Sequence, residues 1–363
     1  MNPTTIEVSE PVASGESTRY DVRIGAGVLG GVREHLAGRT VVVVTDAHVR
    51  KLHAAKLALD AHVLEIERGE AAKGFATLER VLETFAERAL DRRAVVVALG
   101  GGSIGDLAGL AASLYMRGIE CVQCPTTLLA QVDASVGGKT AINLRAGKNL
   151  AGTFHPPSAV FADSSTLLTL DDEEFRSGLG EVLKSALLAG EDFTSWLELN
   201  AAAFPRRDAE VLAETVARSV RLKAAIVARD PRERGERKAL NFGHTFAHAI
   251  EHVAGFGRVP HGVAVGVGIA LAVRAGASTA VAPAHAAFVA RVDRLLAALE
   301  LDSSLATLRR RYGCGLPARD LIASMRLDKK GRASEPRFVL LDAPGKVRID
   351  QTLPGEVVER MLA

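Results

Sequence analysis

The chain has 363 residues, of which 48% are apolar and only 4% are Phe, Trp or Tyr. Its formal net charge of +2, from 45 basic and 43 acidic residues, gives no reason to expect a polyanionic partner such as a nucleic acid. The polar N-terminus and the lack of any run of about 18 apolar residues argue against a signal peptide and a membrane span. We therefore expect a cytoplasmic protein, long enough for two domains.

Short β-rich runs alternate with helical segments over the first part of the chain. The runs are continuously apolar, as strands covered on both faces must be, so the alternation predicts a parallel, doubly wound, Rossmann-like sheet. The predicted strands are TVVVVTD, AHVLEIE, AVVVALG, IECVQCP and AVFAD, at residues 40–46, 61–67, 94–100, 119–125 and 159–163. IECVQCP contains Cys121 and Cys124, which we interpret as small core residues because no second cysteine pair accompanies them.

The pattern changes at TLDDEEF, which is typical of a helix start with early acidic residues. Long Ala- and Leu-rich segments of helical periodicity follow and predict a helical second domain. We expect an α/β domain at residues 1–170 and an all-α domain at residues 171–363. Residues 262–281 are strongly apolar, but Arg274 interrupts them, which favours a buried helix. RFVLL and KVRID flank DAPG and predict a small hairpin.

A glycine-rich turn, GGGSIGD, joins a predicted strand to a predicted helix and places Gly100, Gly102 and Gly105 in a GxGxxG frame. Such a turn lets the backbone approach a pyrophosphate at a helix N-terminus, which suggests a dinucleotide site. A tight turn that merely needs glycine is the alternative. Asp46 is a candidate partner for the ribose if its strand lies beside the loop, and Asp106 is expected to cap the helix or contact the cofactor.

Four of the ten histidines lie in NFGHTFAHAIEHVAGFGRVPHG: His244, His248, His252 and His261. Asn241, His244 and His248 are spaced to share one helix face, which His252 continues. Imidazoles with a carboxylate are typical donors of catalytic zinc, and Glu181, a lone acid in an apolar helix, is the best candidate for the carboxylate. The alternative is a set of histidines that are only hydrogen-bonded.

Polar segments supply further candidates. Lys139, Lys148 and Asn149, in VGGKTAINLRAGKN, can converge on a phosphate or on hydroxyls. Lys184 lies one turn after Glu181 and is expected to point toward the same site. Solvated lysines are the alternative for each.

Six separated segments together resemble the 3-dehydroquinate synthase family, over residues 41–341 and in the family's order: GGGSIGDLAGLAASLYMRG, PTTLLAQVDASVGGKTAINLRAGKNLAGTFHPP, GLGEVLK, NFGHTFAH, HGVAVG and DKKG. The resemblance implies an NAD domain joined to a helical metal domain, with the active site in a cleft between them. Such lyases of the shikimate pathway convert 3-deoxy-D-arabino-heptulosonate 7-phosphate to 3-dehydroquinate and phosphate. The route is transient oxidation by NAD, β-elimination of phosphate, re-reduction and intramolecular aldol closure.

The resemblance also implies roles for individual residues and a homodimer. The metal, zinc or cobalt, would be held by Glu181, His244 and His261. Catalytic roles would fall to Lys139, Lys184, Arg237, Asn241 and His248. Substrate would be bound by Arg117, Asp133, Lys148, Asn149, Lys223, Lys329 and Lys330. NAD would contact Asp46, Glu70, Lys73, Gly101, Gly102, Asp106, Thr126, Thr127, Lys139, Lys148 and Thr169.

Alternatives from other classes remain. One is another sugar-phosphate cyclase, of the aminodehydroquinate or epi-valiolone type. Arg237, Asn241 and His248 favour the dehydroquinate type, whose substrate carboxylate needs a nearby cation. A metal-dependent alcohol dehydrogenase is a second alternative, although the lysine-rich block is hard to justify for a simple alcohol. A third is a non-catalytic protein that binds NAD or metal, which the intact polar set disfavours.

Overall fold

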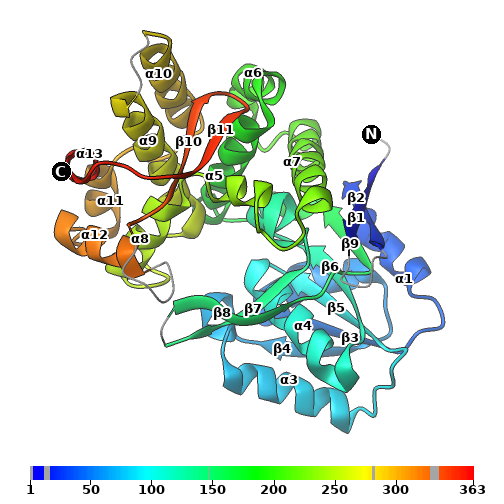
Figure 1. The fold of residues 1–363 in the computed structure, drawn as a ribbon. Coiled ribbons are helices and arrows are strands. Elements are labelled where there is room, and N and C mark those ends of the chain that lie inside the picture. The colour runs from blue at the N-terminus through cyan, green and yellow to red at the C-terminus, as the bar shows by residue number, and fades with distance from the viewer. Residues whose placement is uncertain (1–2, 12–16, 146, 280–282, 328–334) are drawn as a thin grey trace. The chain divides into compact units, whose positions relative to one another are not determined.

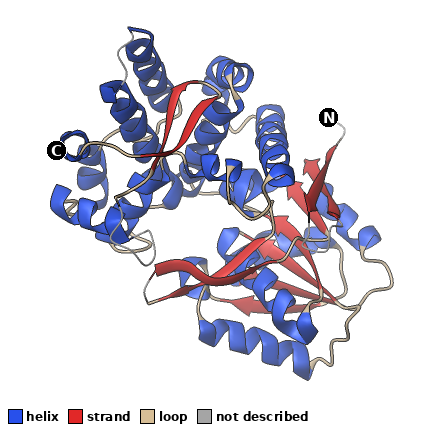
Figure 2. Ribbon diagram, viewed as in Figure 1, coloured by secondary structure: helices blue, strands red, loops and turns tan. Residues whose placement is uncertain are grey.

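A computed structural model describes residues 3–11, 17–145, 147–279, 283–327 and 335–363. The chain divides into two compact units. The first contains Met1–Asp171 and Arg207–Pro231, and the second contains Asp172–Arg206 and Arg232–Ala363. Figure 2 shows that most strands belong to one large sheet, whereas the rest of the chain is predominantly helical.

The first unit is built on a seven-stranded sheet of order β1-β2-β9-β6-β5-β3-β4 (Figure 1). Neighbouring strands are parallel except for the antiparallel pair β1 and β2. All five predicted strands are present, and β1 and β2 are additional. The strands are β1 (Thr4–Pro11), β2 (Ser17–Gly25), β3 (Val41–Asp46), β4 (His62–Ile66), β5 (Val95–Gly100), β6 (Glu120–Pro125) and β9 (Ala159–Asp163).

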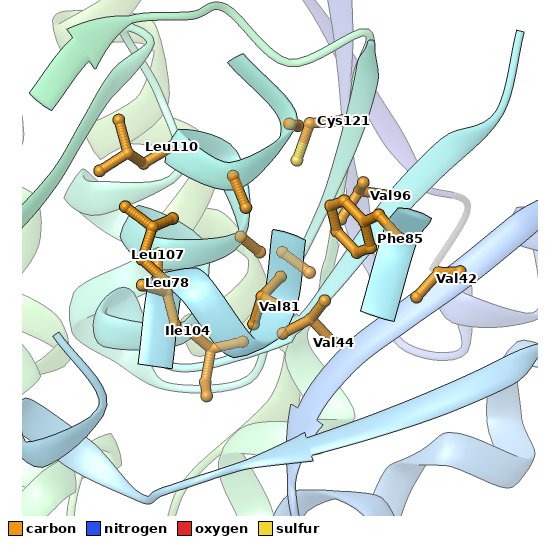
Figure 3. Packing of buried hydrophobic residues seen from close by; sticks show 14 of the residues in the cluster. Val42, Val44, Leu78, Val81, Phe85, Val96, Ile104, Leu107, Leu110 and Cys121 are labelled. Carbon is orange, nitrogen blue, oxygen red and sulfur yellow. The ribbon is translucent and has the colours of Figure 1, made fainter. Parts of the chain in front are cut away.

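Helices cover both faces of this sheet. Alternate strand residues point to opposite sides, and since both sets are apolar, both faces must be buried. On one face α3 (Phe75–Glu87) and α4 (Gly102–Leu114) contribute Phe85 and Leu107 to one buried cluster with Val96 (Figure 3). On the other face Val97 packs with residues of α1 (Val32–His35), α2 (Ala47–His53), η1 (Val28–Gly31) and η2 (Ala54–Leu57). The doubly wound prediction is confirmed. Cys121 and Cys124 are buried free thiols in the two opposite clusters, as predicted.

Two further elements of this unit differ from expectation. β7 (Lys139–Leu144) and β8 (Gly147–Phe154) form an antiparallel hairpin where the sequence indicated polar loops, and β7 packs on α4. α7 (Ala209–Arg229) packs on β1 and on the π-helical turn Ala130–Ala134, and so falls in the first unit although the sequence assigned it to residues 171–363. Short 3-10 helices complete the unit: η3 (Gly69–Ala72), η4 (Tyr115–Arg117) and η6 (Ser164–Thr169).

The second unit is a group of helices around α9 (His261–Thr279), which contacts α5, α8, α10 and the hairpin of β10 and β11. The predicted buried helix and the predicted hairpin are both confirmed. Within the described ranges, no helix combines the length and hydropathy that crossing a membrane requires. The other elements are α5 (Asp172–Ala189), α6 (Glu191–Asn200), η7 (Ala201–Ala203), η8 (Glu236–Asn241), α8 (His244–Ala254), α10 (Pro283–Ala298), α11 (Leu305–Tyr312), α12 (Ala318–Leu327), β10 (Phe338–Ala343), β11 (Lys346–Gln351) and α13 (Gly355–Leu362).

Candidate functional site

Three side chains of the second unit converge on one point. Glu181 lies within α5, whereas His244 and His261 are the first residues of α8 and α9. The Nε2 atoms of His244 and His261 lie 3.5 and 3.4 Å from Glu181 Oε1. One ligand atom from each residue falls within 4.8 Å of the other two, a spacing that suits a single metal ion. One carboxylate and two imidazoles are donors used by catalytic zinc sites, which leave a further position open.

Glycines next to the three ligands allow the helices to approach closely enough. A Cβ atom on Gly180 would lie 1.9 Å from Gly262 O, and one on Gly262 would lie 1.6 Å from Ser177 O. The backbones of α5 and α9 therefore touch beside Glu181 and His261. Gly243 has a φ of 79° and directly precedes His244. Backbone contact thus fixes the separation of the ligands.

Substituting Gly262 with alanine is expected to weaken zinc binding about tenfold or more, because the added methyl group pushes α9 away from α5 and moves His261 relative to Glu181. The same overpacking should cost about 1–3 kcal/mol of stability. Gly266→Ala is the matched control on α9, since its Cβ would meet the nearest atom only at 3.6 Å. Chelator competition measures both variants, and equal zinc affinity in the two would contradict the expectation.

The three ligands differ in their electrostatic surroundings. Lys184 Nζ lies 2.5 Å from Glu181 Oε2, and both side chains are almost fully buried. Burial lowers the pKa of His244 to about 3, and Lys184 adds to the effect. Burial also opposes a charge on His261, but hydrogen bonds with Glu181 and Glu251 outweigh it and raise the pKa to about 10. A metal ion takes the place of such a proton when it binds an imidazole nitrogen.

A cavity of about 480 Å³ opens beside His244 in the second unit. His248, Asn241 and Glu233 also line it, and Asn241 Nδ2 donates a hydrogen bond to Glu233 Oε1. The prediction that Asn241 shares a helix with the histidines is wrong, because Asn241 ends η8 and the left-handed Gly243 separates it from α8. Its side chain still reaches the same cavity. Glu233 was not identified from the sequence.

His252 packs against other elements, away from the three predicted ligands. Its Nδ1 lies 2.9 Å from Ser324 Oγ on α12, and its ring packs against Phe256. The histidine-rich segment therefore has two roles. His244, His248 and His261 form a cluster with ring centroids 5.3–6.2 Å apart, whereas His252 makes a separate hydrogen bond.

The glycine loop of the first unit follows β5 and leads into α4, as predicted, with Gly101 as the N-cap. A Cβ atom on Gly100 or on Gly105 would lie 2.6 Å from a side-chain atom of Ile104 or of Gln123. Internal packing is therefore enough to require glycine at these two positions. This agrees with the alternative interpretation, in which the turn needs glycine for structural reasons and not for a dinucleotide. The N-terminus of α4 still suits an anion. β3 lies beside β5, so the condition for Asp46 is met, and Asp46 Oδ1 caps α2.

A buried lysine connects the segments near this loop. Lys73 Nζ lies 2.5 Å from Asp106 Oδ2 and also donates to Asn149 Oδ1. Burial raises the pKa of Asp106, although the charge of Lys73 opposes the shift. Asn143, which sequence reasoning missed, donates from its backbone N to Lys73 O at 2.8 Å and from Nδ2 to Glu70 Oε2 at 2.6 Å. Glu70, Lys73, Asp106 and Asn149 thus belong to one network, and Asp106 does not cap α4.

The threonines assigned to NAD occupy two places. Thr126 N donates to Gly100 O at 2.9 Å, and a Cβ atom on Gly101 would lie 3.1 Å from Thr127 Cγ2, so both threonines lie next to the glycine loop. Thr169 lies in η6, where its Oγ1 is 3.0 Å from His53 Nε2 and donates to Thr166 O at 2.8 Å. Because the Thr169 proton is used in this way, His53 Nε2 must be the donor of the first bond.

Acid is expected to destabilise the protein through His53, which is 2% exposed. Burial, with a smaller effect of Lys56, lowers its pKa from 6.5 to about 4. The unfolded chain therefore binds a proton between pH 6.5 and 4 that the folded chain does not, and stability falls as the pH drops through this window. In urea unfolding, the free energy of unfolding of the wild type should fall between pH 7 and pH 5 by about 2 kcal/mol more than that of His53→Gln. Parallel pH profiles would contradict this assignment.

The remaining predicted residues keep definite positions. Lys223 Nζ on α7 lies 2.7 Å from Asp133 Oδ1, so two predicted substrate residues form an ion pair. Arg117 has a φ of 68° in the turn after α4. Lys329 and Lys330 lie outside the described residues. Of the others, Lys139 begins β7, Lys148 and Asn149 lie on β8, and Arg237 is buried in η8.

A dinucleotide-type sheet together with a His₂Glu centre in a helical unit is the arrangement of an NAD- and metal-dependent enzyme. Family models of the 3-dehydroquinate synthase N-terminal and C-terminal domains match residues 63–177 and 178–331. The chain is 42% identical over 375 residues to the 3-dehydroquinate synthase of Nitrobacter winogradskyi, which covers 100% of this chain and 96% of the relative. It is 44% identical to that of Cereibacter sphaeroides, over 94% of each chain. The chain belongs to the 3-dehydroquinate synthase family.

Solved structures agree with the fold. A 2-epi-5-epi-valiolone synthase from Streptomyces hygroscopicus subsp. jinggangensis, with NAD+ and Zn2+ bound, matches with a TM-score of 0.85 and 28% identity over 97% of this chain and 98% of that one. A 2-deoxy-scyllo-inosose synthase has a TM-score of 0.87 at 24% identity over 99% of both chains. A probable glycerol dehydrogenase from Sinorhizobium meliloti reaches only 0.65 at 18% identity, over 93% of both chains. The last two matches show the fold alone, and the predicted fold class is confirmed.

Proposed function

We propose that this protein is a 3-dehydroquinate synthase, which converts 3-deoxy-D-arabino-heptulosonate 7-phosphate to 3-dehydroquinate and phosphate. The observation that carries the proposal is the convergence of Glu181, His244 and His261 in a chain of this family. The reaction releases phosphate by β-elimination, which cleaves a carbon–oxygen bond and forms a carbon–carbon double bond, so the enzyme would be a lyase. A homodimer is the assembly that the family resemblance favours, and light scattering tests it.

The residues present fit a divalent metal ion. Two imidazole Nε2 atoms face one carboxylate, and His244 of this set lines a cavity large enough for a sugar-sized ligand. We assign Glu181, His244 and His261 as the ligands of zinc or cobalt. When bound, the metal would polarise substrate hydroxyls and NAD would accept and return a hydride. The 2-epi-5-epi-valiolone synthase, with its NAD+ and Zn2+, supports both assignments.

The first unit supplies groups that suit NAD. The glycine loop at the N-terminus of α4 would take the pyrophosphate, and Asp46, at the end of the adjacent strand β3, would face a ribose. The network of Glu70, Lys73 and Asp106 would hold another part of the cofactor. The remaining contacts are proposed for Gly101, Gly102, Thr126, Thr127, Lys139, Lys148 and Thr169.

The substrate carries a carboxylate, a phosphate and several hydroxyl groups, and the chain offers matching groups. Asn241 and His248 line the cavity beside the metal set, which suits hydrogen bonds to hydroxyls and proton transfer by His248. Arg237 would pair with the carboxylate. Positive charge near the phosphate would favour its departure. We assign the positive charge to the arginine and lysines, and further polar contacts with the substrate to the aspartate and asparagine, of the following set: Arg117, Asp133, Lys139, Lys148, Asn149, Lys184, Lys223, Lys329 and Lys330.

The decisive experiment incubates the purified protein with the heptulosonate phosphate, NAD and zinc. We expect phosphate release without accumulation of NADH, because the hydride returns to the substrate within each cycle. Equal amounts of NADH and product would instead indicate an alcohol dehydrogenase. No phosphate release by metal-loaded protein would reject the proposal.

Parallel incubation with sedoheptulose 7-phosphate separates the main proposal from another sugar-phosphate cyclase. That substrate lacks the carboxylate for which Arg237 is proposed, so we expect turnover of the heptulosonate only. The curated relatives named 3-dehydroquinate synthase are 41–44% identical to this chain, against 28% for the epi-valiolone synthase, which favours the same outcome. Faster release of phosphate from sedoheptulose 7-phosphate would reassign the substrate.

A further inference from the structure

A second carboxylate lies behind the metal set. Glu251 is 1% exposed, and its Oε2 lies 3.0 Å from His261 Nδ1. The opposite ring nitrogen, His261 Nε2, lies 3.4 Å from Glu181 Oε1. The imidazole of His261 is therefore held between two carboxylates, one on each side of the ring.

His244 has the same arrangement with a weaker partner. Its Nε2 faces Glu181 Oε1 at 3.5 Å, and its Nδ1 lies 3.1 Å from the backbone oxygen of Phe242. Both histidines thus direct Nε2 toward the same carboxylate oxygen and use Nδ1 to donate to an acceptor. The acceptor is a backbone carbonyl for His244 and the carboxyl group of Glu251 for His261. An acceptor on Nδ1 leaves Nε2 as the nitrogen with a lone pair for a metal.

The chain places Glu251 there by helical spacing. Glu251 follows His244 by seven residues and His248 by three on α8, so all three side chains share one face of that helix. A carboxylate this deeply buried is costly unless it is paired. His261 is the paired group across the contact between α8 and α9.

We propose that Glu251 is a positioning residue for the metal centre: it fixes the ring of His261 with Nε2 toward the metal and strengthens that nitrogen as a donor. The proposal rests on the metal set assigned under the proposed function. A charged acceptor raises the basicity of the ligating imidazole more than a carbonyl does. His261 is accordingly the stronger of the two nitrogen donors, and its strength depends on a residue that does not touch the metal.

Two substitutions separate orientation from charge. Glu251→Gln keeps the shape and an oxygen that can accept from Nδ1, but removes the charge. Glu251→Ala removes both. We expect the zinc affinity of E251A to fall about 10- to 100-fold, and that of E251Q to fall less. Zinc affinity is measured by competition with a chelator, without substrate or NAD. The absorption spectrum of the cobalt-substituted protein should shift in both variants, because the ligand field at His261 changes.

Ser324→Ala is the matched control, since it removes an imidazole hydrogen bond from His252 on the same helix but away from the ligands. It should bind zinc and cobalt as the wild type does. Folded E251Q with wild-type zinc affinity and an unchanged cobalt spectrum would overturn the proposal, and E251Q decides the matter if E251A does not fold. A wild-type protein that takes up no zinc would also overturn it. Dependence of zinc binding on Glu251 in a protein that forms no dehydroquinate would support this proposal while rejecting the proposed function.

Discussion

Replacing Glu181 with alanine is expected to remove metal and activity together, with zinc affinity reduced by more than about 100-fold. Glu181 Oε1 is the oxygen that both histidine Nε2 atoms face, at 3.5 and 3.4 Å. Without it, two imidazoles remain and the charge that matches a dication is lost. Zinc content after dialysis and phosphate release from the heptulosonate phosphate measure the two effects on the same preparation.

A control is needed because Glu181→Ala also affects Lys184. Its ammonium group would lose the carboxylate that lies 2.5 Å away. Breaking a buried ion pair from one side costs roughly 3–5 kcal/mol, so Glu181→Ala alone can lose zinc by losing its fold. Glu181→Ala combined with Lys184→Met removes both charges, and should recover stability without recovering zinc. Full zinc occupancy in either folded variant would exclude Glu181 from the ligand set.

The sequence predicted the central strands of the fold but missed two pairs. β3, β5 and β6 are buried along almost their whole length, so apolar residues predominate in each of them. β1 and β2 are antiparallel at the sheet edge, and β1 is buried only at alternate positions near its end. Such a strand does not stand out by hydropathy. β7 and β8 were missed because β7 buries only Thr140 and Ile142, β8 buries no residue, and both strands are rich in lysine, glycine and asparagine.

The position of α7 could not be predicted for a different reason. The sequence showed its helical pattern, and the observed helix Ala209–Arg229 agrees with that pattern. Amphipathic spacing indicates that a helix has a buried face, but not which element covers it. Its contacts with β1, β2, η6 and the turn Ala130–Ala134 place α7 with the sheet, and these tertiary contacts are not encoded in the spacing.

At the candidate site, the sequence indicated which side chains can bind a metal, but not which neighbours surround each of them. Histidine and glutamate are donor types, so Glu181 and the histidine segment stood out before any geometry was known. Asn241 was assigned to α8 because helical spacing cannot reveal that Gly243 adopts a left-handed conformation. Glu251 carried a signal that was overlooked, since it lies three and seven residues after two histidines of one helix. No such spacing pointed to Asn143, because Glu70 and Lys73, two of its hydrogen-bond partners, are distant in sequence.

Removing the charge of Lys73 is expected to have the largest effect in the first unit. Lys73 is 4% exposed and lies between Asp106 Oδ2, at 2.5 Å, and Asn149 Oδ1. Burial already raises the pKa of Asp106, and Lys73 opposes this rise more strongly than any other group. Lys73→Met leaves the carboxylate without its cation, which should cost about 3 kcal/mol in urea unfolding. NAD should bind about 10- to 100-fold more weakly, as expected when a charged hydrogen-bonding group is lost from a site.

The double variant Lys73→Met with Asp106→Leu separates the two consequences. It removes both members of the ion pair, so most of the lost stability should return, because an apolar pair of similar size avoids the cost of a buried unpaired charge. NAD affinity should stay low, since the proposed cofactor contacts of both residues are then absent. If NAD binds the folded double variant as tightly as it binds the wild type, the ion pair serves the fold alone and the cofactor must be held by the glycine loop and Asp46 without it.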